Sequence, residues 1–160
     1  MSKIVVVGSC NIDITVECDR WVHPGETIFG NRLTISPGGK GANQAVAAAR
    51  LGADVMMVGC IGDDVYGQLV LKALKENNVD STYVKVLPGE NSGTAHITVA
   101  ETITRLSLSR LPIDLVSPSL IDEAWRISAR QTWCSCSTKS LPLPMPMSLK
   151  NAQRTVYLCC

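Results

Sequence analysis

The stretch SPGGKGANQAVAAARLG, residues 36–52, places three glycines around Lys40 directly before an alanine-rich segment. Alanine favours a helix and Gly52 is a typical helix terminator, so we expect a helix over residues 41–51. Bare glycines permit close approach of a ligand, and the first turn of a helix offers free N–H groups and a partial positive charge. Such a turn suits hydroxyl oxygens as well as anions, and Asn43 can donate and accept there.

Two phosphate-binding motifs are excluded at this turn. A Walker A loop requires a glycine where Thr34 stands and a serine or threonine where Gly41 stands. A dinucleotide-binding fingerprint requires its third glycine where Gln44 stands. A bare glycine turn is also compatible with a purely structural connection.

A second group of polar residues, in GSCNID, follows the apolar run IVVVGS at residues 4–9. Asn11 and Asp13 come just past this first expected strand, at the sheet edge where α/β proteins bind ligands. Two positions apart in an extended segment, their side chains share a face. A carboxylate beside an amide can hold vicinal hydroxyls of a sugar, although a turn-forming pair is an alternative interpretation.

The order of expected elements defines a fold class. Alternation, apolar runs and turn signals predict strands at 4–9, 13–21, 26–36, 55–62, 81–87 and 93–100, and helices at 41–51 and 65–78. Strands that alternate with helices predict an α/β fold with a parallel sheet, and the early alternating pair predicts a smaller antiparallel flap. Asp63 or Asp64 can cap the second helix.

Composition excludes several classes of partner. The 160 residues are 46% hydrophobic and 18% charged, with a net charge of +1, so neither a nucleic acid nor an anionic membrane surface is an expected partner. No apolar run approaches the roughly 20 residues needed to span a bilayer. Met1 leads directly into an apolar strand without a charged leader, so we expect a cytoplasmic location.

The cysteines do not predict a metal site. Cys10, Cys18 and Cys60 lie in apolar segments, where a small buried thiol is expected. The remaining four crowd the end of the chain with poor zinc spacing and no nearby histidine: Cys134, Cys136, Cys159 and Cys160. We therefore assign no metal ligand.

Taken together, VVVGSCNID, PGETIFGN, GGKGANQAVAAARLGA, VGCIGDDVYGQ and NSGTAHITV resemble the ribokinase branch of the PfkB family of carbohydrate and nucleoside kinases. These strings occur in the family's order over residues 3 to about 100. The resemblance implies the N-terminal part of a ribokinase-like αβα sandwich with a small β-sheet lid. It also implies ATP-dependent phosphorylation of a sugar, D-ribose to ribose 5-phosphate in the first place.

The resemblance assigns roles by position. Asn11 and Asp13 would hold the secondary hydroxyls of the sugar. The other side of the sugar would be lined by Gly39, Lys40, Gly41 and Asn43.

Further implications concern the lid and the cofactors. The lid would be formed or supported by strands near 12–18 and 28–36 with Ala95 and Ile97, and would also form a homodimer interface. Glu26 would fix the lid turn, His96 would be structural, and Asp63 and Asp64 would cap a helix. ATP and Mg²⁺ serve the intact family, with K⁺ in some relatives.

The catalytic base, the glycine-rich anion hole and the ATP pocket of the family belong to a C-terminal half that these residues do not match. We therefore expect no catalytic or cofactor-binding residue here, and no phosphoryl transfer by this chain alone. Two alternatives stay open: a fructose-like or nucleoside acceptor within the family, or an inactive sugar-binding or association fragment.

After Ala100 the pattern changes, and we expect three regions. Residues 1–100 form a partial ribokinase-like domain with its lid strands. Residues 101–125 are a degraded continuation with a family-like island at 114–125, and residues 126–160 an aberrant, disordered tail. Permissive back-translation of 101–113 in a shifted frame allows DNNTIIVIPAAN, and from Arg126 it allows DISKADMVLVQHEIPA, both family-like. We hypothesise base insertions or deletions, which resequencing the DNA would test.

Overall fold

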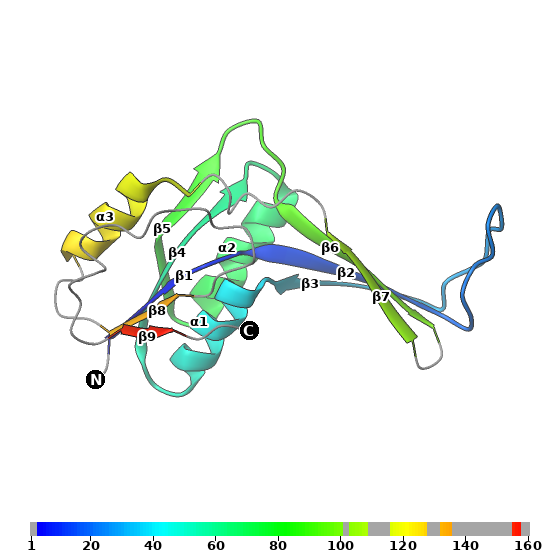
Figure 1. The fold of residues 1–160 in the computed structure, drawn as a ribbon, viewed down its shortest axis with the longest axis horizontal. Coiled ribbons are helices and arrows are strands. Elements are labelled where there is room, and N and C mark those ends of the chain that lie inside the picture. Colours follow the sequence, from blue (N-terminus) through cyan, green and yellow to red (C-terminus); the bar gives the residue numbers. More distant parts are fainter. Residues whose placement is uncertain (1–2, 101–102, 109–115, 128–131, 136–154, 158–160) are drawn as a thin grey trace.

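The computed structural model describes residues 3–100, 103–108, 116–127, 132–135 and 155–157 (Figure 1). The strands are β1 (Lys3–Val7), β2 (Asn11–Cys18), β3 (Arg32–Gly38), β4 (Asp54–Gly62), β5 (Val79–Leu87), β6 (Gly93–Ala100), β7 (Ile103–Leu108), β8 (Thr132–Ser135) and β9 (Thr155–Tyr157). The helices are α1 (Lys40–Arg50), α2 (Val65–Glu76) and α3 (Pro118–Ile127). No helix in these ranges is long and apolar enough to cross a membrane.

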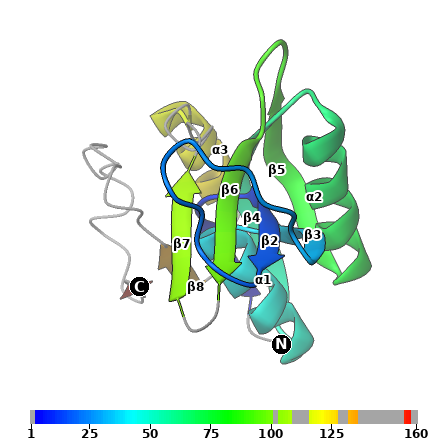
Figure 2. The same ribbon diagram turned by 90° about the vertical axis from the view of Figure 1, so that its right-hand side faces the viewer.

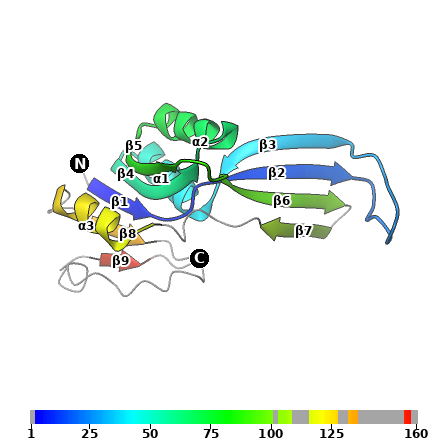
Figure 3. The same ribbon diagram turned by 90° about the horizontal axis from the view of Figure 1, so that it is seen from above.

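The main sheet has the strand order β5-β4-β1-β8-β9, and every neighbouring pair in it is parallel. Figure 3 shows α1 and α2 on one face of this sheet and α3 on the other. The parallel α/β architecture predicted from the alternation of strands and helices is therefore confirmed. A sheet covered on both faces also explains why the first strand is a continuous apolar run rather than an alternating one.

Alternate residues of β1 supply two separate cores. Val6 packs in a cluster with residues of α1 and α2, including Ala45, Val70 and Leu74. On the opposite face, Val5 and Val7 pack in a second cluster with Val116, Ile121 and Ala124 at and just before α3. Each cluster fixes one helical layer against the sheet.

A second sheet, with the order β3-β2-β6-β7, projects away from the main sheet (Figures 1 and 3). In it β2 is antiparallel to β3 and parallel to β6. The flap predicted from the alternating pair is confirmed, and β6 is the strand that carries Ala95 and Ile97 into it.

The expected strand over 26–36 is wrong in its first half, because β3 begins only at Arg32. Residues between β2 and β3 form a loop at the end of the flap away from the main sheet (Figures 1 and 3), which faces the viewer in Figure 2. Within this loop the Glu26 carboxylate accepts hydrogen bonds from the His23 N–H, at 2.9 Å, and from the guanidinium of Arg20. Gly25 at φ +80° makes the turn between them, so this segment bonds to itself rather than to a strand.

The helix starts follow the expected capping chemistry. Of the two candidate caps for α2, the structure selects Asp64, whose Oδ1 accepts a hydrogen bond from Gly67 N at 2.8 Å. The hydroxyl of Ser117 accepts from Leu120 N at 3.3 Å at the start of α3.

Beyond residue 100, where the sequence shows no period, the described residues include three short strands. β7 pairs with β6, β8 pairs with the free edge of β1, and β9 pairs with β8. The disorder expected for 126–160 therefore does not describe 132–135 or 155–157. Strand pairing satisfies backbone groups of an open edge and needs no side-chain periodicity. The region boundaries stay predictions.

Close backbone packing explains the glycine inside α1. A Cβ on Gly41 would lie 2.7 Å from backbone atoms of Gly8 and 2.8 Å from the methyl of Met57. Neither backbone nor a fully buried methionine can easily move away. The first turn of α1 therefore lies directly on the segment that leaves β1.

Gly41→Ala should destabilise the protein by about 1–3 kcal/mol through overpacking, although alanine improves helix propensity by about 1 kcal/mol. The midpoint of urea unfolding measures the change. Ala47→Gly, at an exposed position of the same helix, is the control for propensity alone. A Gly41→Ala variant at least as stable as the parent would contradict the packing argument.

Candidate functional site

The order of strands marks the carboxyl end of β1 as the sheet edge where a ligand is expected. The neighbours of β1 are β4 on one side and β8 on the other. The sheet is therefore extended by β4 and β5 on one side of β1 and by β8 and β9 on the other, which makes β1 the strand at which the strand order reverses. In open α/β sheets, ligands bind at such a switch point, outside the carboxyl ends of the strands. Gly8, Ser9 and Cys10 lead from this end of β1 to Asn11, the first residue of β2.

Asp13 lies over the glycine turn. Asn11 is the register partner of Gly38 across the β2–β3 pair, and Asp13 is the partner of Ser36. A Cβ built on Gly38 would fall within 2.7 Å of both carboxylate oxygens of Asp13. Any side chain at position 38 would displace this carboxylate, so the strand can hold Asp13 here only because position 38 is glycine.

Gly39, the next residue, packs against the backbone of Ser9 and Asn11. Gly39 has φ +95° and is the N-cap of α1. A Cβ on it would lie 2.6 Å from the carbonyl oxygen of Ser9 and 2.9 Å from the backbone nitrogen of Asn11. Three of the predicted site residues, Asn11, Asp13 and Gly39, are therefore together at the carboxyl end of β1.

The polar groups at this edge are not all satisfied by the protein. Asn11 is only 6% exposed, and its side-chain Oδ1 has no hydrogen-bond partner among the described residues. Buried polar atoms without a partner are uncommon and are costly in the absence of a ligand. Asp13 is half-buried, and burial raises the pKa of its carboxyl group. Both groups are acceptors that hydroxyl donors would satisfy.

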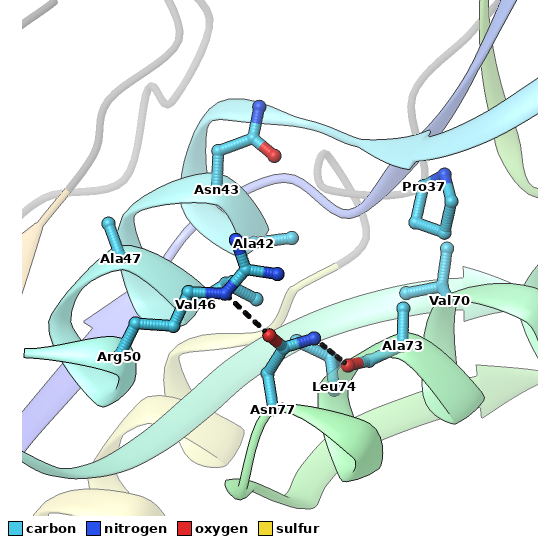
Figure 4. Close-up of a pocket in the computed structure, with 10 residues that line it drawn as sticks. All are labelled: Pro37, Ala42, Asn43, Val46, Ala47, Arg50, Val70, Ala73, Leu74 and Asn77. Carbon is cyan, nitrogen blue, oxygen red and sulfur yellow. Dashed lines mark hydrogen bonds between the residues drawn. The ribbon is translucent and has the colours of Figure 1, made fainter. Parts of the chain in front are cut away.

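The other predicted residues occupy different surroundings. Lys40 is exposed at the first position of α1, and Gly41 is buried against Gly8. Asn43 is exposed and lines a cavity of about 440 Å³ between α1 and α2 (Figure 4). Their contact with a sugar stays a prediction.

That cavity is distinct from the Asn11–Asp13 edge, because neither residue lines it. Its lining residues are Pro37, Ala42, Asn43, Val46, Ala47, Arg50, Val70, Ala73, Leu74 and Asn77. Figure 4 shows the Arg50 guanidinium turned toward Asn77, whose Oδ1 accepts from Arg50 Nε at 2.8 Å. This bond joins the ends of the two helices.

Two amides at the glycine turn are already used within the protein. In the first turn of α1, Ala42 N donates to the carbonyl of Ser9 at 3.1 Å and Asn43 N donates to Gly39 O at 2.9 Å. Amides used in this way cannot cradle phosphate oxygens. The described residues also gather no group of three histidine, cysteine or acidic side chains.

Sequence reasoning missed Gly38 as a member of the site. Its neighbour Gly39 was selected, but only the β2–β3 register shows that the carboxylate of Asp13 covers Gly38. The double glycine was a signal, yet sequence spacing cannot tell which of two adjacent glycines faces a side chain from a distant strand.

An αβα layer arrangement with a projecting β-sheet lid, and with Asn11 and Asp13 at the end of the switch strand β1, defines the class of protein. The pfkB family carbohydrate kinase profile matches residues 1–148, so the chain belongs to this family. The match extends past residue 100, where the sequence strings that resemble the family end.

Curated relatives support the same family. A ribokinase of Bacillus subtilis is 52% identical over 101 residues, which are 63% of this chain and 34% of that protein. A ribokinase of Lactococcus lactis is 38% identical over 126 residues, 78% of this chain and 42% of that protein. The chain thus spans between a third and a half of the length of these relatives.

Solved structures share the fold. The ribokinase of Thermotoga maritima superposes with a TM-score of 0.81 at 28% identity, covering 98% of this chain and 52% of that one. The ribokinase of Arabidopsis thaliana, complexed with ribose and ATP, gives 0.73 at 29% identity, covering 85% and 46%. The ribokinase-like fold predicted from the sequence is confirmed.

Asp13→Asn should raise the melting temperature of the ligand-free protein at neutral pH, because burial makes the ionised carboxylate unfavourable in the folded state. With a folded pKa above the unfolded value of 3.8, this penalty is complete above the folded pKa and vanishes as the pH falls below the unfolded one. The difference between variant and parent should therefore shrink in acid. Thermal denaturation from neutral to acidic pH measures it, with the exposed Asp63→Asn as control. An unchanged or lower melting temperature for Asp13→Asn would contradict the assignment.

Proposed function

We propose that this chain provides the sugar-binding part of a kinase that phosphorylates D-ribose to ribose 5-phosphate with ATP. The observation that carries the proposal is the buried Oδ1 of Asn11, which has no hydrogen-bond partner in the described part of the chain, two residues from the half-buried Asp13, whose carboxylate lies over the glycine turn. The names of the similar proteins, ribokinases of B. subtilis and L. lactis, support ribose as the acceptor.

Each residue has a defined task in this proposal. The Oδ1 of Asn11 accepts a hydrogen bond from one secondary hydroxyl, and the two oxygens of Asp13 accept from neighbouring hydroxyls. The missing side chain of Gly38 leaves room for the Asp13 carboxylate, and that of Gly39 lets the turn lie against the backbone of Ser9 and Asn11. Lys40, Gly41 and Asn43 complete the opposite side.

Phosphoryl transfer itself is assigned to other parts of the intact enzyme. ATP with Mg²⁺ supplies the phosphoryl group in the family, and K⁺ activates some relatives; no described residue is given a task in that step. We propose that these 160 residues bind the sugar without transferring phosphate. Positioning of both reactants and stabilisation of charge are each needed for transfer.

Ribose titrated into the purified chain should release or absorb heat and give a saturable isotherm. Asp13→Ala should weaken binding at least about tenfold, since a hydrogen bond to a charged group contributes about 1.5–3 kcal/mol. Fructose and a nucleoside serve as competing acceptors, and Asp63→Ala serves as the matched control at an exposed carboxylate. Tighter binding of fructose or the nucleoside would favour the alternative acceptors.

A coupled assay for ADP run beside the titration separates binding from turnover. Binding without ADP is the expected result. ADP release that depends on ribose would show that the chain alone is active, while the absence of any sugar binding would contradict the proposed function.

The lid provides the surface for a proposed homodimer. Leu33 and Ile35 on β3 are 63% and 45% exposed, on the face opposite to Asp13 and Thr34. They are register partners of Val16 and Ile14, so an apolar strip runs along this face. Exposed apolar strips on a projecting sheet favour pairing with a second copy.

Leu33→Lys combined with Ile35→Lys should shift the chain toward the monomer, because charge on the strip opposes its burial. Sedimentation velocity over a range of protein concentrations measures the change. Thr34→Lys on the opposite face is the control and should leave association intact. If the parent is monomeric at every concentration, or the double variant associates as the parent does, the lid is not the interface.

A further inference from the structure

The loop that leads from β5 into the lid is tied to the main sheet by one serine and one aspartate. Ser92, just before β6, is only 3% exposed. Its backbone N–H donates to Oδ2 of Asp64 at 2.8 Å, and its hydroxyl donates to Oδ1 of Asp64 at 2.6 Å. The same hydroxyl accepts from Gly62 N, at the end of β4, at 3.0 Å.

The surrounding backbone is packed too closely for this loop to shift freely. A Cβ on Gly62 would lie 2.3 Å from Ser92 N and 2.4 Å from Glu90 O. Asp63 N also donates to Glu90 O at 3.1 Å. The loop is therefore held at two points against the end of β4.

Asp64 does more here than cap a helix. A cap needs one acceptor, and Oδ1 serves Gly67 N in that way. Oδ2 instead accepts a hydrogen bond from Ser92 N in the loop before β6, 28 residues further along the chain. Burial alone would raise the pKa of Asp64, but the hydrogen bonds from Ser92, Gly67 and Tyr66 lower it, so the carboxylate stays ionised and each bond is charge-assisted.

The tied residue adjoins the sugar-binding strand. Gly93 follows Ser92 and is the register partner of Asn11 in the parallel β2–β6 pair, and Ala95 is the partner of Asp13. The position of β6 at this end therefore sets the position of the two residues proposed to hold the sugar.

We propose that Asp64 and Ser92 are positioning residues for the sugar site. They fix the start of β6 to the main sheet and, through the β2–β6 register, hold Asn11 and Asp13 over the glycine turn. Neither residue touches the sugar. The inference rests on the proposed function for its ligand, but the restraint on β2 and β6 can be measured without any ligand.

Two variants separate the hydrogen bonds between Asp64 and Ser92 from the helix-capping bond of Asp64. Ser92→Ala removes the hydroxyl and leaves the bond between Gly67 N and Asp64 Oδ1. Asp64→Asn keeps an oxygen for Gly67 N but places an amide where Oδ2 accepts from Ser92 N. Ser117→Ala, which removes a cap contact at the distant α3, is the matched control for a loss of stability without a link to the lid.

Hydrogen–deuterium exchange and ribose titration of the whole chain form the two readouts. In Ser92→Ala and Asp64→Asn, amides at 11–13 and 93–95 should exchange faster while those of the main-sheet core at 55–58 keep their rates. The dissociation constant for ribose should rise about tenfold, the scale of one charge-assisted hydrogen bond. Ser117→Ala should change neither quantity.

Unchanged exchange at 11–13 and 93–95 in both variants would overturn the proposal whatever the sugar result. Faster exchange with unaltered ribose affinity would also overturn it, because the link would then be structural only. If the parent chain binds no ribose, the proposed function fails, and the exchange data alone decide whether Asp64 and Ser92 restrain β2. Should Ser92→Ala fail to fold, Asp64→Asn, which preserves side-chain volume, provides both readouts.

Discussion

The structure depends on the direct contact of a bare glycine turn with the backbone that leaves the central strand. Gly39 and Gly41 lie so close to Ser9 and Gly8 that a Cβ at either position would overlap main-chain atoms. This contact seats the first turn of α1 on the end of β1. It also fixes the start of β2, because Asn11 N borders the same glycine. The positions of α1, β2 and the lid therefore follow from one close approach between the glycine turn and the backbone after β1.

Within residues 3–100 the chain passes between the main sheet and the lid at three places, and each has its own restraint. Gly8 N donates to Val58 O at 3.1 Å at the first passage, and the glycine turn closes the second. Asp64 and Ser92 hold the third. Since backbone packing and ionic hydrogen bonds restrain all three, the lid is attached as a defined extension of the sheet rather than as a loose hairpin.

The candidate site combines two features that oppose stability. The Oδ1 of Asn11 is buried without a hydrogen-bond partner among the residues that the structure describes, and the carboxyl group of Asp13 has a pKa raised by burial. Proteins retain such costs mainly where a ligand compensates for them. The chain belongs to the pfkB family of carbohydrate kinases, and the sugar that we propose as its ligand would match these acceptors, because sugars carry several hydroxyl donors on adjacent carbons.

For residues 3–100 the sequence by itself determined the order of elements, the parallel sheet, the lid and the placement of Asn11 and Asp13 together past the first strand, since these follow from local periodicity and turn chemistry. Tertiary structure alone decided that Gly38 accommodates the Asp13 carboxylate, that β3 starts at Arg32, and that Asp64 joins Ser92. It also placed 132–135 beside β1. These features depend on contacts between residues distant in the chain, and a pattern within one segment carries no record of which distant backbone will lie against it.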